Sequence, residues 1–229
     1  MSGSTDAGRA VLAHSSMNAP VPFAWLARLC GLLLLGYVRL IVLTCRIRGA
    51  ATRDQVVLTF WHEFNLAALV VALKCRRDLR HASFSTRGFR GQVISTMLER
   101  SRAQVHVLPL PPERDRGAAR DFALRLAGLA ATGSSPVVTP DGPFGPYRIA
   151  KPGTLIIARE SGLAIQPWAM AVHPALRLSG RWDRQVLPLP FCSLRVVEGR
   201  RIQIGERERL SPRLAELQSE LMRTSAASV

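Results

Sequence analysis

Cysteine and lysine are both scarce in this chain. Its 229 residues include only 4 cysteines, and none of them form a Cys-x-x-Cys pair, so we expect no structural zinc site and no bound metal. Unpaired thiols at such irregular spacing are typical of a reducing compartment. Lys74 and Lys151 are the only lysines, so arginine supplies nearly all of the 31 basic residues. With 16 acidic residues the net charge is +15, and a surface rich in arginine favours phosphate, on an anionic membrane or on nucleic acid.

The sequence also lacks the usual signatures of nucleic-acid binding. No recognition helix, RNA-binding motif or zinc finger accompanies the positive charge, so we expect an anionic membrane surface, and no nucleic acid, as partner. The chain is 48% hydrophobic and 21% charged, which argues against disorder, and its length suits one domain with a substantial core. Residues 1–22 are rich in Ser, Gly and Ala, have little pattern, and are predicted to form a mobile tail.

Residues 23–45 are the most apolar stretch. As a helix they would extend over about 34 Å, which is enough to cross a bilayer. Arg28 and Arg39, however, limit the uninterrupted apolar run to residues 29–38, and they lie on the same side of a helix. We therefore expect residues 23–46 to form a peripheral or monotopic helix in the interface, on the cytoplasmic face of the inner membrane. A spanning helix and a helix packed on the domain's own core are the alternatives.

From residue 47 to residue 229 short β-type runs alternate with helical patterns. This alternation predicts an α/β fold, with a layered mixed sheet and flanking helices. Strands are expected at residues 55–60, 81–85, 104–108, 136–139, 164–172, 195–198 and 201–204. Helices are expected at residues 63–74, 92–100, 117–131 and 154–161, followed by a C-terminal helix that starts near Ser211.

Residues 139–153 form the most unusual segment, with the sequence Thr-Pro-Asp-Gly-Pro-Phe-Gly-Pro-Tyr-Arg-Ile-Ala-Lys-Pro-Gly. Its prolines and glycines exclude both helix and ladder strand, and Asp141-Gly142 is a turn dipeptide. The segment lies between an expected strand and an expected helix, a position where α/β folds hold anions. It is therefore either an anion-binding loop or a tight structural connection.

Four sequence blocks follow one another in an order that is specific to one group of enzymes. They are Phe60-Trp61-His62, then Pro140 to Pro146 with Lys151-Pro152-Gly153, then Ser161 to Ile165 with Pro167, and last Trp182-Asp183-Arg184 with Leu187 to Phe191. Together, over roughly residues 56–205, these blocks resemble the lysophospholipid acyltransferase-like DUF374 family, a branch of the glycerolipid acyltransferase superfamily.

The resemblance implies a membrane-bound acyltransferase. Such an enzyme moves a fatty acyl chain from an acyl thioester, on coenzyme A or a carrier protein, to a lysophospholipid or lipid A-like acceptor. It needs no bound cofactor. The superfamily's catalytic His matches His62, and a His of near-neutral pKa suits a general base. Asp141 and Gly142 match the superfamily's acidic-Gly pair beside that His. The acidic residue expected five positions after the His is Ala67 here, so Glu63 and Asp141 are the candidates to orient His62, and the choice stays open.

Other residues of these blocks are candidates for substrate binding. Backbone N–H groups around Gly142 and Gly145 are candidates for the oxyanion site, and Arg148 and Lys151 for phosphate binding. Pro143, in the same loop, is a further substrate-binding candidate.

The chain also departs from the family's pattern in two places. Arg87 matches an Arg of the family's Ser-Arg-Ser-Arg-Asp-Gly block and is a further substrate-binding candidate, but the Asp of that block is replaced by Arg90. The family's Arg-Gly-Ser element is replaced by residues 108–112, which contain no arginine. Arg114 or Arg116, just after them, is the candidate to substitute as a phosphate ligand. With Ala67, these changes leave a catalytically silent lipid-binding relative as the alternative function.

Overall fold

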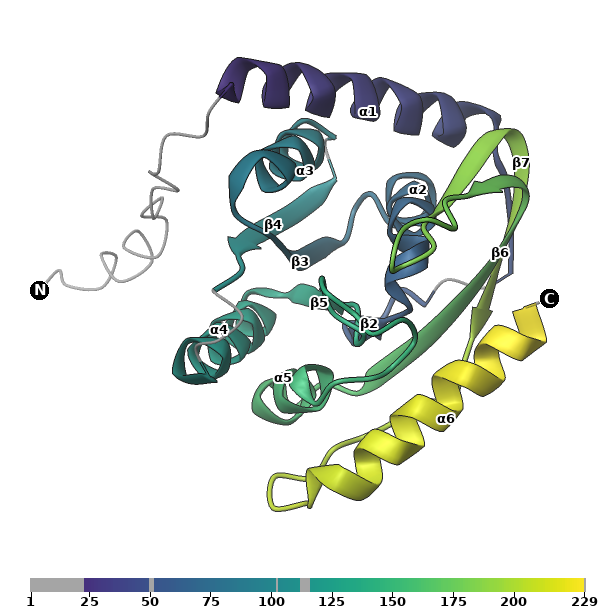
Figure 1. Cartoon of the computed structure of the whole chain (residues 1–229). Helices are drawn as coiled ribbons and strands as arrows, with labels where there is room; N and C mark the ends of the chain where they lie inside the picture. The colour runs from purple at the N-terminus through teal and green to yellow at the C-terminus, as the bar shows by residue number, and fades with distance from the viewer. Residues whose placement is uncertain (1–22, 50–51, 102, 112–115, 229) are drawn as a thin grey trace, which may run out of the picture.

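The computed structural model describes residues 23–49, 52–101, 103–111 and 116–228, so the tail predicted for residues 1–22 lies outside the described residues. The described residues form a seven-stranded mixed sheet in the order β1-β7-β6-β2-β5-β3-β4 (Figure 1). The strands are β1 (Arg46–Arg48), β2 (Val57–Thr59), β3 (Arg80–Ser85), β4 (Gln104–Pro109), β5 (Ser134–Val138), β6 (Ile165–Arg177) and β7 (Val186–Glu198). The predicted α/β fold with flanking helices is confirmed.

Helices cover both faces of this sheet. They are α1 (Ala24–Thr44), α2 (Asn65–Cys75), α3 (Gly88–Arg100), α4 (Arg116–Gly128), α5 (Gly153–Ser161) and α6 (Leu210–Ser228), with short 3-10 turns η2 (His62–Phe64) and η3 (Leu129–Thr132). Figure 1 shows α1, α2 and α3 on one side of the sheet and α4, α5 and α6 on the other.

The centre of the sheet is parallel. β2 lies between β5 and β6, and β3 lies between β5 and β4, with all of these pairs parallel. Parallel strands joined by helices align their carboxyl ends at one edge, where α/β folds place their sites. At the other side of the sheet β6 and β7 form a long antiparallel pair, and β1 runs parallel to β7.

The α1 helix is part of the domain core. Its inner face is buried at Ala27, Gly31, Leu35, Val38 and Ile41, and it packs mainly on α3 and α2. The contact at Gly31 is so close that a Cβ there would lie 2.8 Å from a carbonyl oxygen of α3, so only glycine fits. The boundary expected at residue 46 is therefore not a boundary in the packing. The helix is nevertheless long and apolar enough to cross a membrane by length and composition.

The chain after residue 185 differs from the sequence expectation. Two short strands were expected at residues 195–198 and 201–204, but β7 already begins at Val186, and of the later stretch only Ile202 forms an isolated bridge, with Ile165. Pro188 and Pro190 hid this strand, because proline normally argues against a ladder. Around these prolines the register between β6 and β7 shifts, from His173↔Ser193 to Ala175↔Pro188, so a bulge absorbs residues 189–192.

Candidate active site

His62 lies where β2 ends and the turn η2 leads into α2. Its backbone N–H donates to Asp141 Oδ1 at 3.1 Å. Asp141 follows β5, and β5 is the parallel neighbour of β2, so the two strand ends bring the 139–153 loop beside His62. The register of the parallel sheet therefore explains why two blocks 79 residues apart meet.

The carboxylate that orients His62 is Asp183. Asp183 Oδ2 lies 2.9 Å from His62 Nδ1, and the carboxylate is fully buried. Arg181 donates to both of its oxygens at 2.8 Å. Burial alone would raise the pKa of Asp183, but the hydrogen bonds and charge of Arg181 outweigh it and hold that pKa below its usual value. An ionised Asp183 accepts from Nδ1–H, which leaves Nε2 of His62 free to accept a proton.

The environment of the imidazole suits a base at neutral pH. Burial lowers the pKa of His62, while the Asp183 carboxylate opposes this effect, so the ring is neutral at pH 7. The ring of Trp182 lies beside it, with centroids 5.1 Å apart. A Cβ on Gly145 would lie 2.8 Å from that ring, and Gly145 has a φ of 75°, so glycine is required for Trp182 to pack there.

Glu63, one of the two residues considered for orienting His62, faces away from the ring. Its fully buried carboxylate accepts from Tyr147 Oη at 3.0 Å, from Arg148 Nε at 2.7 Å and from Arg177 Nη1 at 2.5 Å. The structure therefore places Glu63 in a network that joins the start of α2 to the 139–153 loop and to β6. Arg148 belongs to this network as well, so its guanidinium is already paired with Glu63.

Asp141, the other candidate, contacts the backbone of His62 and not its ring. Its carboxyl is buried, and Oδ2 has no hydrogen-bond partner in the described part of the chain. Burial raises the pKa of Asp141 to about 6, although backbone N–H groups, including that of His62, oppose the shift. Asp141 thus positions the turn that carries His62.

The remaining residues predicted to bind substrate lie in different places. The Gly142 amide donates to the Thr139 carbonyl at 3.0 Å, so it closes a turn and is not a free oxyanion donor. Lys151 is half-buried, and its ammonium lies near Gly142, 3.5 Å from where a Cβ would be. Pro143 and Arg87 both line the cavity beside His62.

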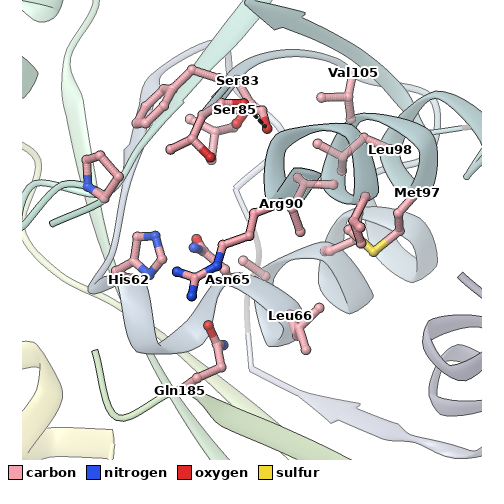
Figure 2. A pocket seen from close by; sticks show the side chains of 18 of the residues that line it. His62, Asn65, Leu66, Ser83, Ser85, Arg90, Met97, Leu98, Val105 and Gln185 are labelled. Carbon is pink, nitrogen blue, oxygen red and sulfur yellow. Dashed lines mark hydrogen bonds between the residues drawn. The ribbon is translucent and has the colours of Figure 1, made fainter. Parts of the chain in front are cut away.

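His62 opens onto a large cavity of about 1190 Å³ between the sheet and helices α1, α2 and α3. Its walls are mostly apolar, with Leu34, Leu69, Phe84, Ile94 and Met97 among the side chains that line it. Figure 2 shows His62 and Asn65 at one side of this space and Leu66, Met97 and Leu98 further in. Such a cavity suits a long apolar chain.

The charged side chains of the cavity are all basic. Among the described residues that line it there are four arginines, Arg76, Arg87, Arg90 and Arg181, and no carboxylate. Arg181 is neutralised by Asp183, whereas Arg87 and Arg90 are exposed and form no ion pair within the described ranges. Figure 2 shows Arg90 reaching from α3 across the cavity toward His62 and Asn65. The positive charge beside the imidazole is therefore free to meet an anion.

Sequence reasoning missed two parts of this site. Asp183 was visible in the Trp-Asp-Arg block, but nothing in the sequence shows that a residue 121 positions away meets His62. Arg90 was noted only as a departure from a pattern. Arg114 lies outside the described residues, and nothing is described of the Arg116 side chain. Across the described residues, no group of three His, Cys, Asp or Glu side chains is placed to hold a metal ion.

Comparisons with known proteins give two similarities. No known family profile matches the chain. An uncharacterized protein of Rickettsia prowazekii (strain Madrid E) is 27% identical over 145 residues, which are 63% of this chain and 62% of that protein, so the match spans about three fifths of each. The crystal structure of the 1-acyl-sn-glycerophosphate acyltransferase PlsC from Thermotoga maritima superposes with a TM-score of 0.47 and 13% identity, over 90% of this chain and 80% of that chain. Neither similarity by itself assigns an activity to this chain.

Proposed function

We propose that this protein is an acyltransferase that moves a fatty acyl chain from an acyl thioester to a hydroxyl group of a lysophospholipid or lipid A-like acceptor. The observation that carries the proposal is the His62–Asp183 pair, with Nε2 free, at the side of a large apolar cavity. The four sequence blocks that resemble the DUF374 acyltransferase family support it, because two of them supply His62 and Asp183.

The chemistry follows from the orientation of the imidazole. His62 Nε2 takes the proton of the acceptor hydroxyl as its oxygen attacks the thioester carbonyl. Asp183 stabilises the imidazolium that forms and keeps the ring in the required tautomer. When the tetrahedral intermediate collapses, the C–S bond breaks, the C–O bond remains, and His62 returns the proton to the departing thiolate. The products are an acyl ester and a free thiol.

The cavity is the proposed site of the acyl chain. It is lined by His62, just before α2, and by Arg76, just after that helix. Since α2 has 11 residues and is therefore about 16 Å long, residues from both ends of this helix line the cavity. Apolar walls of this extent make the chain's burial favourable without any polar contact.

The arginines beside His62 are proposed to hold an anionic group of the substrate. Arg87 and Arg90 bear free charge, and guanidinium groups bind phosphate through paired hydrogen bonds. Arg90 stands where the family pattern has Asp, so this chain puts a positive charge where those relatives put a negative one. Lys151, near Gly142, is a further proposed phosphate contact. The donor is either acyl-coenzyme A or an acyl carrier protein.

A catalytically silent lipid-binding protein is the second candidate. It was favoured by Ala67, which replaces the acidic residue expected after the catalytic His. Asp183, from a distant part of the sequence, provides the carboxylate next to Nδ1 of His62. The absence of an acidic residue at Ala67 is therefore no argument for loss of catalysis. The replacement of the family's Arg-Gly-Ser element by residues 108–112 remains as an argument for it.

We place the enzyme at the cytoplasmic face of the inner membrane, attached through α1. The inner face of α1 packs on α2 and α3, so a monotopic attachment keeps the core intact whereas a spanning α1 would break it. An anionic lipid surface, not nucleic acid, is the proposed partner of the positive charge.

Lipid mass spectrometry of a deletion strain tests the function most directly. The strain is complemented with wild type, with His62→Ala and with His106→Ala, which changes an exposed histidine outside the cavity. We expect an acylated lipid to disappear on deletion and to return with wild type and His106→Ala only. Full restoration by His62→Ala would favour the lipid-binding candidate instead.

A further inference from the structure

The outer face of α1 is as apolar as its buried face. It exposes large hydrophobic side chains along its whole length, at Trp25, Leu29, Leu32, Leu33, Leu40 and Leu43. These positions fall within about 100° around the helix axis, opposite the buried residues. Residues 23–48 contain no Asp or Glu, and Arg28 and Arg39 lie at one border of the stripe. An exposed apolar stripe of this length on a folded domain indicates contact with another apolar phase.

A second apolar element, far away in sequence, adjoins the other border of the stripe. The Tyr37 hydroxyl donates to the Pro188 carbonyl, and Arg46 pairs with Ser193, so the β7 bulge at residues 189–192 lies along the C-terminal half of α1. Figure 1 shows this end of β7 close to the end of α1. The bulge exposes Leu189 and, above all, Phe191, which is 79% exposed.

Phe191 combines two unfavourable features that a partner would explain. Its φ of 64° lies in the left-handed region, which is strained for any residue with a Cβ. The strained backbone holds a large aromatic ring out in solvent, where it gains nothing from the domain's own core. Leu43 of α1, 80% exposed, is equally uncovered. An apolar phase that covers both side chains would remove the cost of their exposure to water.

Exposed arginines lie next to this apolar surface, on β1 and β7. In the β1–β7 ladder Arg48 lies opposite Arg195, and like charges in register repel. Both are exposed, as is Arg46, and none of the three has an ion pair in the described part of the chain. Because β1 begins two residues after α1 and rises about 3.3 Å per residue, Arg46 lies about 7 Å and Arg48 about 13 Å along the chain from the end of α1. An anionic partner relieves their repulsion.

We propose that the outer face of α1 and the β7 bulge with Leu189 and Phe191 dock together into one leaflet of an anionic bilayer, with Arg46, Arg48 and Arg195 at its headgroups. The proposal rests on the membrane location given above and extends it to an element about 150 residues further along the chain. Lipid is the occupant because the surface joins an exposed apolar stripe to basic groups and includes no acidic residue in residues 23–48 or 186–197. A bulge beside α1 also fixes the rotation of the domain on the membrane, which a single helix would not.

Flotation of the full chain with lipid vesicles tests this docking. Vesicles of phosphatidylcholine are compared with vesicles that contain about one third phosphatidylglycerol. Phe191→Ser should lower the partition coefficient by about three- to tenfold on both. The control Leu124→Ser removes an exposed leucine of α4, far from the stripe, and should leave it unchanged. Equal values for Phe191→Ser and Leu124→Ser would overturn the proposal.

The arginines are tested in the same assay by their dependence on lipid charge. Arg48→Gln with Arg195→Gln should lower partitioning on the anionic vesicles by about fivefold per arginine, and hardly at all on the neutral ones. Arg125→Gln on α4 removes one exposed charge as the control. A loss no greater than that of the control would refute their headgroup contact.

A second measurement does not depend on weakened binding. Phe191→Trp should show fluorescence quenching by brominated lipid beyond that of wild type, and Leu124→Trp should not. If light scattering instead shows a dimer that Phe191→Ser dissociates while vesicle binding is unchanged, a second copy covers this surface and the lipid proposal fails. None of these readouts uses turnover, so a failure of docking and a failure of acyl transfer are told apart.

Discussion

Two groups of charged side chains lie on either side of His62, and they differ in how completely their hydrogen-bonding groups are paired. Behind the imidazole, the Glu63 network consists of Glu63, Tyr147, Arg148 and Arg177, and both carboxylate oxygens of Glu63 have donors. In front of it, the cavity group consists of His62, Arg87 and Arg90, which all line the cavity. There Arg87 and Arg90 are exposed and form no ion pair within the described ranges, and Figure 2 shows His62 and Arg90 pointing into the cavity.

The difference separates architecture from function. A buried carboxylate whose partners are all within the protein has nothing left with which to bind a ligand, so the Glu63 network joins segments of the fold. Unpaired groups beside a cavity are the ones a substrate can satisfy. Changes in the cavity group should therefore reduce turnover with little effect on stability, and changes in the Glu63 network should do the reverse.

The largest effect is expected for His62→Ala. Removing the general base should lower kcat by roughly 100- to 10,000-fold. Asp183 keeps its bidentate bond from Arg181, so no buried charge is stranded and the unfolding free energy should change little. Purified variants are compared for acyl transfer and for urea denaturation, with His106→Ala as the control. Normal turnover by His62→Ala would remove His62 from the mechanism.

Asp183→Asn should give the next largest loss, roughly 10- to 1,000-fold in kcat. It removes the charge that raises the pKa of His62, so burial and the charge of Arg181 both lower that pKa unopposed, and the acidic limb of the rate profile should shift to lower pH. Kinetics over pH measure both effects.

The double variant His62→Ala with Asp183→Asn provides the control for this pairing. It should be hardly slower than His62→Ala, because the carboxylate acts only through the imidazole. Fully additive losses would mean that Asp183 contributes independently of His62.

Glu63→Gln should act on stability. The carboxylate is fully buried, but the two arginines that it pairs with are 26% and 49% exposed, so its loss should cost about 3 kcal/mol, the lower end for a buried pair. We expect the unfolding free energy to fall by this amount, with a smaller loss of kcat than for Asp183→Asn. Glu216→Gln is the matched control, since Glu216 also meets two arginines but is partly exposed, and it should cost less than about 1 kcal/mol. If both variants lose equally little, the Glu63 network does not stabilise the fold.

The contrast between these two groups also shows how far the sequence can be interpreted. Local patterns predicted the helices, most strands and the position of His62 at a strand end, because each depends on neighbouring residues. The prediction of which carboxylate orients His62 failed, because it depends on contacts between segments that are distant in the sequence. Glu63, adjacent to His62 in sequence, turns away along η2, and Asp183 reaches the ring only through the turn between β6 and β7.

Proline and burial explain the other differences from the sequence-based expectations. Pro188 and Pro190 concealed β7, because a bulge that tolerates them cannot be seen without the partner strand. Residues 23–45 were predicted as a helix, but which of its faces packs on α3 is set by the close approach at Gly31. The sequence does not show that Arg90 lies in the cavity beside His62, so its role as a candidate anion contact could be inferred only from the structure.

The smallest expected effect concerns Asp141, which lies between the two groups. Burial raises its pKa from 3.8 to about 6, so the buried carboxyl favours the protonated form. Its contribution to stability is then fully present below pH 3.8 and is lost as the pH rises toward 6, and it amounts to about 2–3 kcal/mol. Asp141→Asn stays neutral and keeps an oxygen for the His62 N–H, so it should retain that contribution at every pH.

Burial lowers the pKa of His62 and that of His81, the latter to about 4, so these groups change stability in the opposite direction in the same window. The test is therefore the difference in unfolding free energy between variant and wild type, measured by denaturation from pH 4 to pH 7. That difference should grow in favour of the variant as the pH rises, and a difference that stays constant would show that Asp141 is ionised in the folded protein throughout.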